Sequence, residues 1–519
     1  MAVPSFDFDK FRLRTFVNGL AEIGELEVHD EPVAFTDLSS IIEASRKAVL
    51  FRKAGPERVE LVAAVSGGRR RVAHAFGVAP KDVALKFMER MASPQPVHEI
   101  PSGHAPVHER ILTGAEIDLS KLPFFLQHEL DGGVYISAGI DHCVDPLTGK
   151  SNIGCRRLML RTRDTLRSNL TSPSDLKRIY GECVKRGERL PVSFVIGSHP
   201  LDFMTACLRV PGHDELGFVS TMRGEPVPLV RGVTNGVLVP ADAEMVIEGY
   251  FDELGYREKE GPYGEFWGYY GPVHMDPVFH ATAITMRRDA LHQSVLHGVR
   301  KLGRTDGACL NNISFETHMW RALRAANIEP AALYNVASAP PRCHVRVAIA
   351  RGVPGRARAV IAALFAVPGV KHVTVVDEDI DIFSDEEVEW AMSTRFSADR
   401  DLVVAHGFPG VHMDPMLGPD KTGSKVGFDA TEPYGRPSRI DTWRPLPPRI
   451  EGPATANSVR DALAKGPLYF HEIVTALGSR DGREIALEVN ALYLDGVVER
   501  APNGEWMLEE SQRSGGEER

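Results

Sequence analysis

The 519-residue sequence lacks the features of a secreted, membrane-embedded or nucleic-acid-binding protein. No segment approaches the roughly 20 consecutive apolar residues of a membrane helix, and the opening MAVPSFDFDKFRLRTFVNGL has no apolar run of signal-peptide length. The six cysteines form no CxxC pair, which predicts free thiols in a reducing compartment. A net charge of -10 argues against general nucleic-acid affinity, because phosphate binding needs clustered lysine and arginine. We therefore expect a cytoplasmic protein without membrane or nucleic-acid partners.

The motifs of several common enzyme classes are also missing. The sequence has no Rossmann or P-loop glycine pattern and no GxSxG elbow of a hydrolase. His142 and Cys143 share one expected hairpin, but no further soft ligand accompanies them, which disfavours a zinc site. The function therefore has to be inferred from less common patterns.

The length predicts two or three domains. The pattern of expected helices and strands changes three times along the chain. Residues 6–100 predict helices and short strands, and residues 100–300 predict many short strands with Pro/Gly turns, typical of a barrel or sandwich. Residues 310–440 alternate between helix and strand, and the segment after Pro448 predicts three helices and a hairpin, a winged-helix pattern. The expected domains are residues 1–305, 306–448 and 449–519, the last with a disordered end, SQRSGGEER.

Two local patterns make specific structural predictions. The stretch GGVYISAGIDHCVDPLTGKSNIGCRRLMLRT predicts a hairpin whose turn uses Pro146 and Gly149. On its second strand, Asn152 and Arg157 have odd spacing and would face opposite sides, so a shared site requires a bulge or bend, which Gly154 would permit. The run SFETHMWRALRAA predicts a helix capped by Ser314.

The stretch EKEGPYGEFWGYYGP, residues 258–272, is the strongest candidate for chemistry. Glu260 and Glu265 bracket a Gly-Pro-Tyr-Gly turn beside five aromatic residues. Packing against aromatic rings removes water from a carboxylate and raises its pKa, which favours a proton donor. A nearby arginine, such as Arg157, would keep one carboxylate ionised while the other carries a proton. The alternative is an ordinary turn with two surface glutamates.

Several motifs in this order resemble the UbiD family of prenylated-FMN-dependent (de)carboxylases: SNIGCRRLMLR, HDELGFVSTMRGEPVPLV, EGPYGE, VVDEDIDIFSDEEVEWAMSTRF and GSKVGFDAT. The resemblance spans about residues 100 to 440. It implies that Arg157 and Glu260 are charge partners and that Glu265 protonates the carbon left by CO2. It also implies an α+β multidomain fold with a flavin-binding split-β-barrel-like domain and an α/β oligomerisation domain. The pattern after Pro448 adds a winged-helix-like C-terminal module to this expected fold.

The resemblance further implies a cofactor, prenylated FMN, and a divalent metal, Mn2+ or Mg2+, with K+ as a candidate additional ion. Oxygen ligands suit such hard cations. Asp175 is a departure, because the family often has histidine there, and a gap-free count from Arg157 places aspartate instead. The expected metal ligands are Asn152, Asp175 and Glu215, and the expected cofactor contacts also include Ile153, Gly154, Cys155, Arg156, Arg157, Ser174 and Lys425.

The cofactor is needed because loss of CO2 from an sp2 carbon leaves a charge that no side chain can delocalise. The resemblance implies a covalent adduct with an aromatic or heteroaromatic acid, a homodimer or higher homo-oligomer, and a prenyl-flavin synthase as cofactor source. The aromatic residues beside Glu265 would form a dry wall beside the flavin. The segment LHGVRKLGRTDGACL carries His297, Arg300 and Arg304, which either bind a second anionic group of the substrate or form a solvated basic turn or subunit contact.

Two alternatives stay open at this point. The departure at Asp175 and the extra C-terminal segment are compatible with a non-catalytic scaffold or regulator on the same fold. A net carboxylase of the same substrate class is the other alternative, because an enzyme accelerates both directions. The winged-helix pattern does not predict DNA binding, since its second and third helices carry only Arg480 and Arg483 as fixed positive charges.

Overall fold

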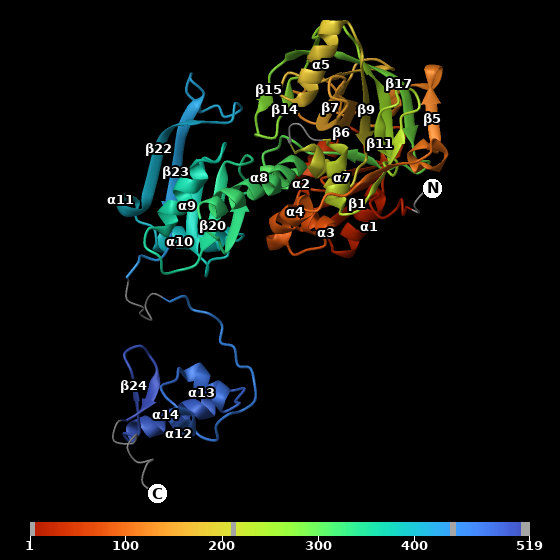
Figure 1. The fold of residues 1–519 in the computed structure, drawn as a ribbon. Coiled ribbons are helices and arrows are strands. Elements are labelled where there is room, and N and C mark those ends of the chain that lie inside the picture. Colours follow the sequence, from red (N-terminus) through yellow and green to blue (C-terminus); the bar gives the residue numbers. More distant parts are fainter. Residues whose placement is uncertain (1–5, 209–213, 436–442, 510–519) are drawn as a thin grey trace. The chain divides into compact units, whose positions relative to one another are not determined.

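The computed structural model describes residues 6–208, 214–435 and 443–509. The chain forms two compact units, residues 1–432 and 433–519, which are described separately (Figure 1). The final segment SQRSGGEER, which is predicted to be disordered, lies outside the described residues. Among the described residues, no helix is long and apolar enough to cross a membrane.

A closed barrel of six strands forms the centre of the first unit. The strands pair in the order β12-β9-β6-β7-β8-β17, and β17 pairs again with β12 to close the ring. The predicted hairpin is confirmed: Gly149 has φ +70°, and its N–H donates to the carbonyl of Asp145 at 2.8 Å. The barrel strands are β6 (Tyr135–Val144), β7 (Ser151–Leu160), β8 (Thr165–Ser168), β9 (Leu190–Ile196), β12 (Met245–Phe251) and β17 (Val278–Met286). Strand β5 (Arg110–Thr113) pairs with Ala283–Met286 of β17, beyond the residues of β17 that pair with β8.

Two small sheets and several helices surround the barrel. A four-stranded sheet has the order β1-β2-β3-β18, and a three-stranded sheet has the order β11-β10-β4. The strands are β1 (Leu26–His29), β2 (Ala48–Ala54), β3 (Val59–Ala63), β18 (His292–Ser294), β4 (Val97–Glu99), β10 (Val227–Arg231) and β11 (Leu238–Pro240). The helices are α1 (Leu13–Glu22), α2 (Leu38–Ala44), α3 (Arg69–Phe76), α4 (Val83–Met91), α5 (Asp175–Arg186), α6 (Pro200–Ala206) and α7 (Leu216–Arg223).

The long helix α8 (Asp306–Ala325) links the barrel region to a five-stranded sheet (Figure 1). Thr305, rather than Ser314, caps α8, so the predicted cap is wrong. Ser314 lies inside the helix and donates to the carbonyl of Asn311 at 2.8 Å, because the helical pattern already begins in DGACLNN. The sheet order is β19-β20-β21-β23-β22, with β19 (Ala332–Asn335), β20 (His344–Ile349), β21 (His372–Asp377), β22 (Leu402–Pro409), β23 (Thr422–Asp429), α9 (Arg356–Phe365), α10 (Asp385–Thr394) and α11 (Ala398–Asp401).

The second unit contains the three predicted helices and the predicted hairpin. They are α12 (Val459–Leu463), α13 (Phe470–Ala476), α14 (Arg483–Leu494), β24 (Val498–Arg500) and β25 (Trp506–Leu508). Ile473, Ile485 and Val489 belong to its own apolar core. The winged-helix comparison and the boundaries at residues 305 and 448 stay predictions.

Candidate active site

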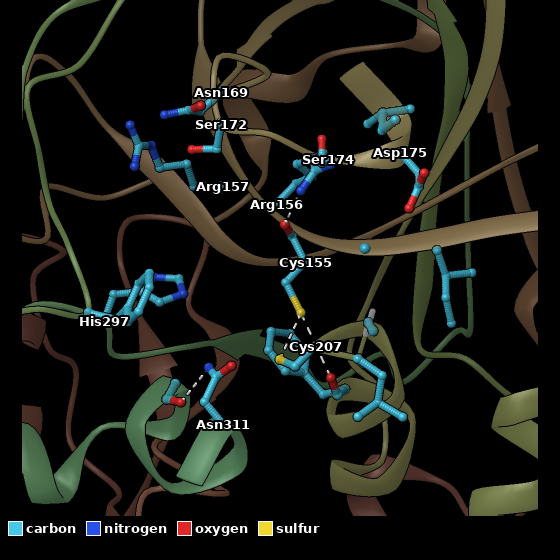
Figure 2. A pocket seen from close by; sticks show the side chains of 18 of the residues that line it. Cys155, Arg156, Arg157, Asn169, Ser172, Ser174, Asp175, Cys207, His297 and Asn311 are labelled. Atoms are coloured by element: carbon cyan, nitrogen blue, oxygen red, sulfur yellow. Dashed lines mark hydrogen bonds between the residues drawn. The ribbon is translucent and has the colours of Figure 1, made fainter. Parts of the chain in front are cut away.

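A cavity of about 380 Å³ lies against β7 in the first unit (Figure 2). Its walls come from β7, the segment leading into α5, the end of α6, the start of α8 and the glutamate loop, which we define as residues 260–271. All of the predicted cofactor contacts except Lys425 line this one cavity, as do Glu265 and His297.

The edge of β7 explains how Asn152 and Arg157 reach the same cavity. β8 pairs with β7 only over Leu158–Leu160, so the preceding residues of β7 pair with β6 alone among the described strands. Side chains from both faces of a strand can reach a space that lies along its open edge. A bulge is also present, but its predicted place at Gly154 is wrong: the register shifts on β6, between Ile136 and Gly139, opposite Arg157.

Arg157 connects both glutamates of the loop. Its Nε and Nη2 donate to the two carboxylate oxygens of Glu260, each at 2.8 Å, and Nη1 donates to Oε1 of Glu265. Burial disfavours the charged guanidinium, but the hydrogen bonds and charge of Glu260 outweigh that effect and raise the pKa of Arg157. Glu260 is fully buried, whereas the Glu265 side chain is 19% exposed, so Glu265 is the carboxylate that can exchange a proton with a bound molecule.

Close backbone contacts hold the glutamate loop in place. The Asp131 carboxylate accepts the N–H of Gly264 at 3.1 Å, and the N–H of Gly132 donates to the carbonyl of Pro262 at 2.9 Å. A Cβ added to Gly298 would lie 2.5 to 2.8 Å from backbone atoms of Gly264 and Glu265. The position of the Glu265 backbone therefore depends on residue 298 being a glycine, because a larger side chain there would collide with the loop.

The predicted aromatic wall is correct only in part. Tyr263 and Phe266 line the cavity, and the Tyr263 ring lies under the Arg157 guanidinium at 4.5 Å. Trp267 lines a separate cavity beside the five-stranded sheet. Tyr269 and Tyr270 are 61% and 42% exposed, because the short β14–β15 ribbon (Tyr263–Gly264 and Tyr270–Gly271) turns them outward.

Asn152, Asp175 and Glu215 line the cavity and carry side-chain oxygen atoms. Oε2 of Glu215 accepts hydrogen bonds from Nδ2 of Asn152 at 2.6 Å and from the N–H of Ile153 at 2.7 Å. Burial raises the pKa of Glu215 to about 7, with the charge of Asp175 adding to the effect. Among the described residues no cluster of three His, Cys, Asp or Glu side chains can hold a metal ion, but this set combines two carboxylates with an amide. Such a donor set fits a hard divalent cation. The charge of the cation would offset the unfavourable free energy of holding two ionised carboxylates close together in a buried site.

Some of the remaining predicted cofactor and substrate contacts line the cavity and others do not. Ser174 caps α5 by accepting the N–H of Lys177 at 3.2 Å, and Nη2 of Arg156 donates to the Ser174 hydroxyl at 3.3 Å. His297 lines the cavity, whereas Arg300 and Arg304 do not, and Arg300 is exposed.

The structure does not bring Lys425 to this cavity, contrary to the prediction. Its Nζ donates to the carbonyls of Phe365 and Val367, at 2.7 and 3.1 Å, at the C-terminal end of α9. Burial lowers the pKa of Lys425 to about 8. In this conformation the ammonium group caps a helix, a role that the motif GSKVG alone does not reveal.

Cys207 and Asn311 are among the lining residues that the sequence analysis did not identify. Cys207 follows α6, and its Sγ lies 3.3 Å from Sγ of Cys155 on β7. Asn311, on α8, donates from Nδ2 to the carbonyl of Gly307 at 2.7 Å. Neither belongs to a recognisable motif, and both reach the cavity only through tertiary packing.

Comparisons with known proteins identify the family. The model described as the 3-octaprenyl-4-hydroxybenzoate carboxy-lyase Rift-related domain matches residues 98–300, and the corresponding C-terminal domain matches residues 314–430. An anhydromevalonate phosphate decarboxylase of Methanosarcina mazei is 32% identical over 424 residues, which cover 81% of this chain and 96% of that protein. The chain belongs to the UbiD family. The predicted family and the predicted lyase class are thereby confirmed.

Solved structures of UbiD-class enzymes share the fold. HmfF from Pelotomaculum thermopropionicum, solved in complex with FMN, matches with a TM-score of 0.77 and 31% identity over 84% of this chain and 97% of that chain. An evolved dimeric form of HmfF was solved with prFMN, at a TM-score of 0.74 and 30% identity over 84% of this chain and 99% of that chain. The vanillic acid decarboxylase of Sedimentibacter hydroxybenzoicus matches with a TM-score of 0.75 and 26% identity over 84% of this chain and 96% of that chain. The matched family models end at residue 430, so the second unit lies outside them.

Proposed function

We propose that this UbiD protein catalyses non-oxidative decarboxylation of an aromatic or heteroaromatic carboxylic acid with prenylated FMN as cofactor. The observation that carries the proposal is the shared cavity: the pair Arg157 and Glu265 and the oxygen donors Asn152, Asp175 and Glu215 line the same space. The flat rings of Tyr263 and Phe266 support an aromatic substrate. Solved relatives that contain FMN or prFMN support the cofactor.

The residues of the chain would divide the work between holding the cofactor and moving a proton. When bound, prenylated flavin supplies the electron sink that no side chain offers. The open edge of β7, from Ile153 to Arg156, would hold the cofactor together with Ser174, and Asn152, Asp175 and Glu215 would hold Mn2+ or Mg2+ beside its phosphate.

Glu265 would donate the proton that replaces CO2. Arg157 orients Glu265 and is itself fixed by two bonds to the buried Glu260, so the proton donor does not need to reorganise during the reaction. The loop and the aromatic side chains of Tyr263 and Phe266 would keep bulk water away from the Glu265 carboxylate. We further propose a homo-oligomer, with the cofactor supplied by a prenyl-flavin synthase.

An acyclic unsaturated acid is a second candidate substrate class. Three curated relatives named anhydromevalonate phosphate decarboxylase are 30 to 33% identical to this chain. The name of these relatives describes an acid that also carries a phosphate group, so a substrate panel has to include phosphorylated acids as well as aromatic acids.

The test is to produce the protein together with a prenyl-flavin synthase and to measure the absorption spectrum, the mass of the bound cofactor and CO2 release. Bound prenylated FMN and metal-dependent CO2 release from an aromatic acid would support the proposal. If only phosphorylated acyclic acids release CO2, the substrate is a phosphorylated acyclic acid and not an aromatic acid. A folded protein that binds no flavin under these conditions would contradict the cofactor assignment and favour the scaffold alternative.

A further inference from the structure

Two thiols from distant parts of the chain meet in the wall of the cavity. Sγ of Cys155, on the open edge of β7, lies 3.3 Å from Sγ of Cys207, the residue that follows α6. The carbonyl of Phe203 accepts the Cys155 thiol at 3.8 Å and the N–H of Cys207 at 3.2 Å, so the last turn of α6 holds both residues. Figure 2 shows the two side chains with their sulfur atoms directed at one another.

These two cysteines are also the most accessible ones in the chain. All six cysteines lie among the described residues and are free, and only Cys155 and Cys207 are partly exposed. Both line the cavity, so a small oxidant that enters it reaches the pair. The sulfur atoms of a disulfide are about 2.05 Å apart, so the pair has to approach by only roughly 1 Å from its present 3.3 Å.

We propose that Cys155 and Cys207 are a redox modification site: a peroxide joins them in a reversible disulfide while the cavity holds no flavin, and bound flavin shields them from this oxidation. The disulfide part stands on the positions of the two sulfur atoms alone. The shielding part rests on the proposed function, which places the cofactor against the β7 edge that carries Cys155.

The reaction balances with hydrogen peroxide as the oxidant. Burial and the hydrogen bond with Cys207 raise the pKa of the Cys155 thiol, which makes Cys155 a poor first nucleophile. The Cys207 thiolate therefore attacks a peroxide oxygen, the O–O bond breaks, hydroxide leaves, and Cys207 becomes a sulfenic acid. The Cys155 sulfur then attacks the Cys207 sulfur, the S–O bond breaks, and a second hydroxide leaves as the S–S bond forms. The two thiol protons convert both hydroxides to water, and two electrons pass from the sulfur atoms to the peroxide.

The neighbouring thiol determines whether oxidation of the cavity can be reversed. A sulfenic acid without a thiol partner is oxidised further to sulfinic acid, which thiol reductants do not restore. With Cys155 at 3.3 Å, the sulfenic acid of Cys207 is instead captured as a disulfide. The pair would therefore preserve the wall of the flavin-free cavity until a thiol reductant reopens it and the cofactor binds.

The disulfide is tested on the full-length chain purified without flavin, by intact mass and peptide mapping after treatment with hydrogen peroxide. We expect loss of the mass of two hydrogen atoms, a bridge between Cys155 and Cys207, and full reversal by dithiothreitol. Cys155→Ser should leave Cys207 to form a sulfinic acid that dithiothreitol does not reverse. Cys183→Ala, which removes a buried thiol on α5, is the control and should form the bridge like the unsubstituted protein.

An unchanged mass, or sulfinic acid in the unsubstituted protein without a bridge, would overturn the disulfide. So would a bridge that involves any of the four buried cysteines. The same mass after peroxide treatment in Cys155→Ser and in the unsubstituted protein would show that Cys155 does not capture the oxidised Cys207.

The shielding is tested by following the rate of disulfide formation in the presence of FMN. At an FMN concentration ten times its Kd, about one molecule in eleven has a flavin-free cavity, so the rate should fall about tenfold. An unchanged rate with FMN bound, as judged from its absorption spectrum, would overturn the shielding. A protein that binds no FMN would contradict the proposed cofactor and the shielding together, while the mass measurement would still decide the disulfide.

Discussion

Arg157 on β7 and Glu260 in the glutamate loop are 103 residues apart in the chain and form a buried pair of parallel hydrogen bonds, each 2.8 Å long. Parallel bonds fix the plane of the guanidinium as well as its position. The remaining nitrogen, Nη1, is thereby directed at Glu265, the more accessible carboxylate. The pair therefore determines where the proposed proton donor can stand.

Glu265→Gln should abolish decarboxylation while the cofactor stays bound. The amide keeps the shape of the side chain but cannot supply a proton, so we expect kcat to fall by about 10² to 10⁴-fold. CO2 release and the flavin absorption spectrum are the two measurements. Glu258→Gln is the matched control, because Glu258 lies on the neighbouring strand β13 (Glu258–Glu260) and pairs with Arg161 near the surface. Full activity of Glu265→Gln would remove its proton-donor role.

Arg157→Lys should impair both activity and stability. An ammonium group cannot form the two parallel bonds, and it leaves Glu260, which is 0% exposed, partly unpaired. We expect the free energy of unfolding to fall by about 2–4 kcal/mol, measured by denaturant titration. Arg161→Lys, one residue beyond β7 in a partly exposed ion pair, should change it by less than about 1 kcal/mol. Equal effects of the two substitutions would show that the buried pair has no special role.

The residues of the chemical cluster could be predicted because they lie in short motifs whose order is informative. Arg157, Glu260 and Glu265 meet as expected. The hairpin turn was also predictable, since Asp145 and Gly149 determine it locally. In both cases the information lies within a few residues of sequence.

Features that depend on packing could not be predicted in the same way. The bulge lies on β6 rather than at Gly154, because the register of a strand is set together with its partner. Tyr269 and Tyr270 share a loop with Tyr263 but face outward, and Lys425 caps α9 although its motif suggests a ligand contact. Composition indicates an aromatic loop, but only the fold decides which rings line the cavity.

Gly298→Ala should displace the glutamate loop without changing any charged group. The added methyl would lie 2.5 to 2.8 Å from backbone atoms of Gly264 and Glu265, so the loop has to move. We expect a loss of about 1–3 kcal/mol in stability and a clear fall in kcat. Gly103→Ala is the control, because an added Cβ there meets nothing within 4 Å. An active variant with unchanged thermal unfolding would show that Glu265 tolerates a shifted backbone.

The effect of Asp276→Asn on the free energy of unfolding should become more stabilising as the pH rises. Oδ1 of Asp276 accepts the N–H of Leu170 at 2.7 Å, while Oδ2 is buried without a hydrogen-bond partner among the described residues. Burial, with the nearby charge of Glu260, raises the pKa of Asp276 from 3.8 to about 6. The folded state therefore holds this proton more tightly than the unfolded chain, so the stabilising contribution of the protonated group is present below pH 3.8 and is lost as the pH rises through 6.

The asparagine side chain keeps the acceptor for Leu170 and removes the charge that is costly above pH 6. The difference in Tm between the variant and the unsubstituted protein should therefore increase in favour of the variant from pH 4.5 to pH 8. It should correspond to a gain on the order of 1–3 kcal/mol. Thermal unfolding followed by circular dichroism across this range provides the measurement. A difference that stays constant with pH would mean that Asp276 has the same proton affinity in the folded and unfolded chains, which would require its unpaired oxygen to be solvated in the native protein.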